Sequence, residues 1–96
     1  MLIWVIYDIS KNKTRSKVER LCKNAGLYRV QKSVFLGEVT EAIQKEFKIT
    51  VEELIDQVTD SVYIFPMNRQ ELKKARLLGQ AFDKGLVTDE VISMFF

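Results

Sequence analysis

Residues 2–9 read LIWVIYDI, a nearly unbroken apolar run that is rich in β-branched and aromatic side chains. Such a run predicts a central strand of a sheet that is covered on both faces. Its only charged residue is Asp8, near the carboxyl end, where alternation along the strand places it on one face with Trp4 and Ile6. We therefore expect the fold to be built outward from this strand.

The segment after this strand predicts a helix, because apolar side chains recur with the i, i+3, i+4, i+7 spacing of one buried stripe. These side chains are Val18, Leu21, Cys22 and Ala25. Gly26 is a natural stop, since glycine adopts the left-handed conformation that often follows the last turn. The start stays open: Ser16 and Glu19 would form a capping box, whereas Asn12 or Thr14 would begin the helix earlier.

Three further strands are predicted. Residues 28–31 and 33–39 have the composition of two short strands that turn near Lys32. After a turn at Asp60 and Ser61, the segment VYIFPM at residues 62–67 predicts another strand, which its proline ends or places at an edge of the sheet.

A second helix is predicted between residues 40 and 59, where the apolar side chains stay on one helical stripe. They are Ile43, Phe47, Val51, Leu54, Ile55 and Val58. This pattern favours a single long helix. A restart at Thr50, with Glu53 completing a capping box, is the alternative.

The order strand, helix, strand, strand, helix, strand is that of the ferredoxin-like α+β fold, βαββαβ, in which both helices cover one face of the sheet. A chain of 96 residues has room for one domain, residues 1–96. A domain of this size buries only roughly 60–65% of the surface that its unfolded chain exposes, so association with a second copy would add to its stability. We expect a homodimer.

Residues 68–96 are predicted to form a C-terminal appendix to this fold. Asn68 and Glu71 would cap a short helix that runs through Leu78. The last six residues, VISMFF, are β-prone and strongly apolar, which is unusual for an end that would otherwise fray in solvent. They predict an additional C-terminal strand that this domain or a partner covers.

Positive charge is concentrated in residues 11–32, although the net charge of the chain is only +2. Eight basic residues and one acidic residue, Glu19, give this segment a charge of +7, and the rest of the chain has seven basic and twelve acidic residues. The basic residues are Lys11, Lys13, Arg15, Lys17, Arg20, Lys23, Arg29 and Lys32. This asymmetry indicates a polyanionic partner, because neutralising phosphates releases counterions. An ordinary solvated helix face is the alternative.

The composition excludes several classes of site. Cys22 is the only cysteine, which rules out an internal disulfide and fits a reducing, cytoplasmic location. Without histidine, a histidine general base and a histidine-ligated zinc ion are both excluded. The apolar opening is far shorter than the ~20 residues of a membrane span, so we expect no signal peptide and no membrane helix. Hydrolysis would therefore depend on carboxylates and a hard divalent ion such as Mg²⁺.

Asp8 is the candidate for such chemistry, because a carboxylate on an apolar strand is costly to bury without a partner. The alternative is a turn residue or a cap for the following helix. Lys11, Lys13, Arg15 and Lys17 surround the start of that helix, where the helix dipole disfavours cations. Their placement is explained if phosphates bind there.

At these residues the chain resembles the Cas2 family of CRISPR-associated proteins, the small dimeric partners of the spacer integrase. The resemblance covers essentially the whole chain. It rests on Tyr7-Asp8-Ile9, on Arg15 and Lys17, on the segment from Gly26 to Phe35, on the segment from Asp60 to Pro66, and on the tail.

This resemblance implies a role in CRISPR adaptation, with a homodimer in which the last strand joins the partner's sheet. It implies that the Asp8 carboxylates of two protomers meet and bind one Mg²⁺ ion, which relieves their repulsion and activates water for phosphodiester hydrolysis. Arg15 and Arg29 would hold phosphate oxygens. Tyr7, Lys17 and Phe35 match further positions of the family pattern, as positioning or base-contacting groups, with core packing as the alternative for Tyr7 and Phe35.

The family includes ribonucleases, nucleases on double-stranded DNA, and inactive scaffolds that hold protospacer DNA for the integrase, and the sequence does not choose among these. A toxin-like ribonuclease of the same fold and a non-catalytic RNA-binding module are alternatives from other classes. The segment from Gly26 to Phe35 argues against the toxin, and the absence of a glycine-aromatic signature argues against the RNA-binding module.

Overall fold

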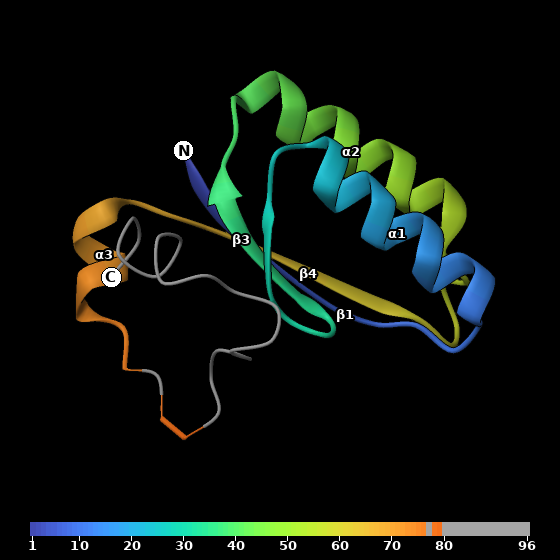
Figure 1. Cartoon of the computed structure of the whole chain (residues 1–96). Coiled ribbons are helices and arrows are strands. Elements are labelled where there is room, and N and C mark those ends of the chain that lie inside the picture. The colour runs from blue at the N-terminus through green and yellow to red at the C-terminus, as the bar shows by residue number, and fades with distance from the viewer. Residues whose placement is uncertain (77, 80–96) are drawn as a thin grey trace.

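The computed structural model describes residues 1–76 and 78–79, which form four strands and three helices (Figure 1). In chain order these are β1 (Leu2–Asp8), α1 (Asn12–Asn24), β2 (Tyr28–Gln31), β3 (Val34–Glu38), α2 (Glu41–Leu54), β4 (Ser61–Met67) and α3 (Arg69–Lys74). The order βαββαβ predicted from the sequence is confirmed, with α3 added after it.

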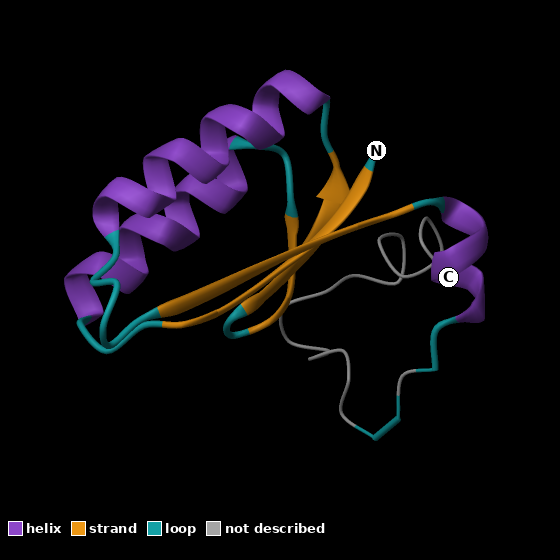
Figure 2. Ribbon diagram, turned by 180° about the vertical axis from the view of Figure 1, so that it is seen from behind, coloured by secondary structure: helices purple, strands orange, loops and turns teal. Residues whose placement is uncertain are grey.

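The four strands form one sheet in the order β2-β3-β1-β4, and every neighbouring pair is antiparallel. β1 is central, as its apolar sequence predicts: Trp4 lies opposite Leu36 of β3 and Phe65 of β4. β4 is an edge strand of this sheet, which agrees with the presence of Pro66 in it. α1 and α2 lie side by side over one face of the sheet (Figures 1 and 2), so the ferredoxin-like arrangement is confirmed.

The main core lies between this face of the sheet and the two helices. Alternate residues of β1 point into it, and Val5 is completely buried. From α1, Val18 and Cys22 are buried and the other two residues of the predicted stripe are partly buried against the core. Phe47 and Val51 contribute from α2. The helix periodicity therefore identified the buried face of both helices, but two residues of the stripe predicted for the second helix were wrong, because Ile43 is 39% exposed and Val58, beyond the end of α2, is 92% exposed.

The opposite face of the sheet, here called the open face, is covered only at one end by the described residues. There Leu72 of α3 packs with Leu2 and Leu36, and α3 lies beyond the far end of β4 (Figure 2). Further along this face, Tyr63 is 55% exposed and Phe65 is 48% exposed. The sequence predicted that both faces of this strand are covered. Within the described part of the chain, this is confirmed only for the first half of β1.

α1 begins at Asn12, which decides between the alternatives for its start. Its N-cap is Lys11, which makes no capping hydrogen bond through its side chain, so the capping box at Ser16 was wrong. Gly26 has φ 89° and ends the helix as predicted. The capping box of α3 is confirmed, because the Asn68 side chain accepts the Glu71 N–H and the Glu71 side chain accepts the Asn68 N–H.

α2 is shorter than predicted, because it ends at Leu54 and not at Thr59. The Asp56 carboxylate accepts the Val58 N–H at 2.9 Å, and such local side-chain bonds compete with the helix. The restart at Thr50 was also wrong, since the helix continues through this residue and its hydroxyl donates to the Glu46 carbonyl. α3 likewise ends before Leu78, at Lys74.

The predicted strand at residues 91–96 lies outside the described residues, so it stays a prediction, as does the division of the chain into one domain with an appendix. In the described part of the chain, none of the helices has the length and apolar content needed to cross a bilayer.

Candidate nucleic-acid interface

Asp8 ends β1 on the open face, as the sequence predicts. Its register partner is Ser61 of β4, and its side chain is exposed. The alternative role of helix cap is wrong, because the N-cap of α1 is Lys11 and no side chain caps that helix. Asp8 also belongs to none of the ion pairs found among the described residues. It is therefore a solvent-accessible carboxylate that no ion pair engages within the described residues.

The donor set around Asp8 limits what one protomer can bind. The described residues contain no group of three or more histidine, cysteine, aspartate or glutamate side chains that could hold a metal ion. Carboxylate oxygens are the donors that Mg²⁺ prefers, so the residue type at position 8 fits this ion. Fewer than three such side chains in the described part of one protomer fit it only if a second copy or the substrate supplies further oxygens.

The loop after Asp8 is held by Asp60, which the sequence analysis did not single out. One oxygen of the Asp60 carboxylate accepts the Ser10 N–H and the other accepts the Asp56 N–H, both at 3.0 Å. These bonds, the first of them strongest, lower the pKa of the Asp60 carboxyl. The sequence predicted a turn at Asp60 and Ser61, but a turn signal does not reveal that Asp60 reaches a loop fifty residues away.

The basic side chains around the start of α1 differ in whether other groups of the protein engage them. Lys11, Lys13 and Lys17 are exposed, and no ion pair engages them in the part of the chain described. The guanidinium group of Arg15, in contrast, donates to the Ile9 carbonyl at 3.0 Å and to the Asn12 side chain. All four predicted residues thus lie between the end of β1 and the second turn of α1, and within the described residues only the lysines are available without rearrangement.

The first turn of α1 contains no acidic residue. This is unfavourable for the helix, whose N-terminus carries the positive end of the dipole. Arg20 is exposed one turn after Lys17 and extends the basic surface along α1. Arg20 belongs to the basic segment of the sequence but was not among the predicted site residues.

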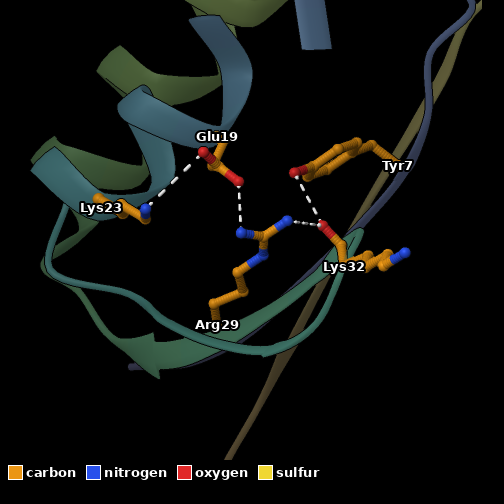
Figure 3. A network of polar contacts seen from close by, with 5 residues as sticks. All are labelled: Tyr7, Glu19, Lys23, Arg29 and Lys32. Carbon is orange, nitrogen blue, oxygen red and sulfur yellow. Dashed lines mark hydrogen bonds and ion pairs between the residues drawn. The ribbon is translucent and has the colours of Figure 1, made fainter. Parts of the chain in front are cut away.

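Arg29 lies in a polar network that joins β2, α1 and the β2–β3 turn (Figure 3). One terminal nitrogen, Nη1, lies 2.7 Å from Oε1 of Glu19, and Nη2 donates to the Lys32 carbonyl at 3.0 Å. The other oxygen of Glu19 lies 3.7 Å from the Lys23 ammonium. The Nε–H of Arg29 is buried and has no hydrogen-bond partner among the residues that the structure describes. Arg29 is therefore already bound to an anion of the protein itself.

Tyr7 and Phe35 are core residues. Their rings stack with centroids 6.3 Å apart, and neither side chain is more than 4% exposed. The Tyr7 hydroxyl donates to the Lys32 carbonyl at 3.4 Å, and burial raises the pKa of this phenol to about 12. The arrangement agrees with the packing alternative for both residues.

The predicted residues do not all meet at one point. Strand alternation points Tyr7 toward the helices and Asp8 toward the open face. Arg29 contacts α1, so it lies on the helix side of the sheet. Asp8 and the three lysines near the start of α1 are therefore one part of the candidate interface, and Arg29 with its network is another.

The comparisons with known proteins agree with this fold. The model of the family described as CRISPR associated protein Cas2 matches residues 1–75. A protein of Korarchaeum cryptofilum named CRISPR-associated endoribonuclease Cas2 is 31% identical over 86% of this chain and 90% of its own length. A Thermoproteus tenax protein named CRISPR-associated endonuclease Cas1/endonuclease Cas2 fusion is 28% identical over 75% of this chain and 27% of its own length.

Among solved structures, the crystal structure of Streptococcus pyogenes Cas2 superposes with a TM-score of 0.69 and is 30% identical, over 82% of this chain and all of that one. Because the family model spans most of the chain and the fold agrees, the chain belongs to the Cas2 family of CRISPR-associated proteins.

Proposed function

We propose that this chain is a nucleic-acid-binding homodimer of CRISPR adaptation that hydrolyses phosphodiester bonds in RNA or DNA with a divalent metal ion. One observation carries this proposal: an exposed carboxylate, Asp8, ends the central strand, and three exposed lysines follow it in the chain at the start of α1. Relatives named endoribonucleases support the activity. The relative that is fused to Cas1 supports an integrase as the partner.

In this proposal Asp8 is the metal ligand and therefore the catalytic residue. A second copy of the chain contributes its own Asp8, because one protomer supplies too few oxygens in its described part. When bound, the ion, Mg²⁺ or another divalent cation, supplies Lewis acidity toward the phosphodiester. Lys11, Lys13 and Lys17 attract and hold phosphates, and the Arg15 guanidinium fixes the Ile9 carbonyl and so the loop that follows Asp8.

The homodimer is supported by surfaces that the described residues leave open. β4 is an edge strand, and Tyr63 and Phe65 stack in parallel on the open face, with centroids 6.0 Å apart, while remaining half exposed. Exposed edges and apolar patches are typical of association surfaces. In our proposal the last residues of the chain pair with the partner's sheet.

A non-catalytic scaffold for protospacer DNA is the second candidate function. It needs the basic surface but not Asp8, and the absence of a three-ligand cluster in the described residues favours it. The toxin-like ribonuclease is disfavoured, because the family model spans residues 1–75. The RNA-binding module is disfavoured because Phe35 is buried and the exposed aromatic pair lies on the edge strand, not on a central one.

A cleavage assay decides between the nuclease and the scaffold. The purified chain is incubated with labelled single-stranded RNA and with duplex DNA, in Mg²⁺ and in chelator. The nuclease predicts products that need the ion, and the preferred substrate identifies the class. Binding without products on both substrates would support the scaffold. Co-purification with an integrase tests the adaptation role separately.

A further inference from the structure

The Glu19 carboxylate lies between two basic side chains, a position in which a nucleic-acid-binding protein would be expected to hold a phosphate group. It lies between two cations, 2.7 Å from Arg29 Nη1 and 3.7 Å from the Lys23 ammonium (Figure 3). It is the only acidic side chain in a segment of eight basic residues. Carboxylate and phosphate share the same recognition by guanidinium and ammonium groups, so a site that holds one has the chemistry to hold the other.

The Arg29 guanidinium is held in place by a contact that does not involve Glu19. Arg29 Nη2 donates to the Lys32 carbonyl, which also accepts the Tyr7 hydroxyl. Lys23 extends from the last turn of α1. Removing the negative charge of Glu19 would therefore free Nη1 while the guanidinium keeps its position.

The side chains of Arg29, Glu19 and Lys23 are also accessible to solvent. The side chains of Arg29 and Glu19 are 27% and 29% exposed, and that of Lys23 is 55% exposed. A partly exposed ion pair contributes little to stability, because water screens it and the two side chains lose entropy. An external phosphate can thus compete with the internal carboxylate at modest cost.

We propose that Arg29 and Lys23 form a phosphate-binding site that Glu19 occupies in the free protein, so that Glu19 is an internal competitor for nucleic-acid phosphates. The inference rests on the proposed function, since it concerns the strength with which the same basic segment binds RNA or DNA. Glu19 lowers the affinity for any phosphate backbone and leaves base preference unchanged, because phosphate contacts carry no sequence information.

The test compares two charge-neutralising variants. E19Q removes the competitor, and E52Q is the matched control, because Glu52 pairs with Lys48 at 3.8 Å on α2 and its removal changes the net charge equally. Affinity for a short labelled duplex DNA and for labelled single-stranded RNA is measured against salt concentration. We expect E19Q to bind about tenfold more tightly than E52Q, and its salt slope on duplex DNA to steepen by about 0.9 for the added phosphate contact. Equal affinities and slopes for the two variants would overturn the proposal.

A second readout does not depend on nucleic acid. The Nε–H of Arg29 is buried, and no group in the described part of the chain accepts its hydrogen bond, so its proton resonance reports on the guanidinium directly. Titration of E19Q with pyrophosphate is expected to shift this resonance, and the wild-type chain should need far more pyrophosphate for the same shift. A resonance that stays unmoved in E19Q contradicts the site. A resonance that moves while neither nucleic acid binds supports the site and refutes the proposed function instead.

Discussion

At the scale of single residues, two carboxylates join different parts of the folded chain. Asp60 accepts the Ser10 N–H, and Glu19 pairs with Arg29 of β2. Local patterns predicted the Gly26 stop and the Asn68 cap, because both depend on neighbours within a few residues. They did not predict that Asp60 would accept the Ser10 N–H, or that Glu19 would bind Arg29. Those contacts require the folded arrangement, so the residue types of the candidate site were predictable but their partners were not.

The Asp60 carboxyl makes the free energy of unfolding depend on pH in the acidic range. This carboxyl has a lowered pKa in the folded chain because the Ser10 and Asp56 N–H groups donate to it. Its contribution is fully present above the unfolded pKa of about 3.9 and is lost as the pH falls through the folded value. We expect urea unfolding of Asp60→Asn to depend less on pH in this acidic range than that of the wild type. Glu53→Gln, an exposed change on α2, is the control, and equal pH profiles for wild type and Asp60→Asn would count against this role.

At the scale of elements, α1 and α2 begin in opposite ways. α2 has Thr40 as its N-cap, whose hydroxyl accepts the Ile43 N–H at 3.1 Å, and Glu41 in its first turn. α1 has Lys11 as its N-cap, whose side chain makes no capping hydrogen bond, and no acidic residue in its first turn. The order of elements and the buried faces of these helices followed from apolar periodicity, whereas the early end of α2 depends on side-chain bonds of Asp56 that periodicity does not register.

Substitution of Lys11 tests whether the residue that lowers the stability of α1 also increases the affinity for nucleic acid. Lys11→Asp supplies both a cap and a favourable charge at the helix start, so we expect the free energy of unfolding to rise by about 0.5–2 kcal/mol. Nucleic-acid affinity should fall at the same time, with a salt slope on duplex DNA reduced by at least roughly 0.9. Thr40→Ala is the converse control, which should lose about 1 kcal/mol without changing affinity. Unchanged binding by Lys11→Asp would place the interface elsewhere.

At the scale of the whole molecule, the described residues leave both an edge and a face uncovered. The sheet ends at β4, and Tyr63 and Phe65 remain half exposed beside it. The sequence predicts a covering segment at its end, where five large apolar side chains lie between Val91 and Phe96. Which chain this segment covers cannot follow from composition, because pairing within a protomer and pairing with a partner bury the same side chains.

Truncation after Thr88 tests the expected dimer. Burying each large apolar side chain contributes roughly 1.5–3 kcal/mol, so loss of the last strand should abolish association. Light scattering of the truncated chain is expected to give the mass of a monomer, and Mg²⁺ binding should be lost because the two Asp8 carboxylates separate. A soluble, intact dimer that still binds Mg²⁺ would refute this account of the interface.

The most direct test of the central claim is cleavage by Asp8→Asn in Mg²⁺, measured beside its nucleic-acid affinity and its mass. The substitution keeps the size of the side chain and removes only the charge of an exposed residue that no described ion pair engages. We predict that metal-dependent cleavage is lost while the dimer and the affinity for RNA or DNA stay close to those of the wild type. Full cleavage by Asp8→Asn would contradict the account, because the ion would then be held by other groups.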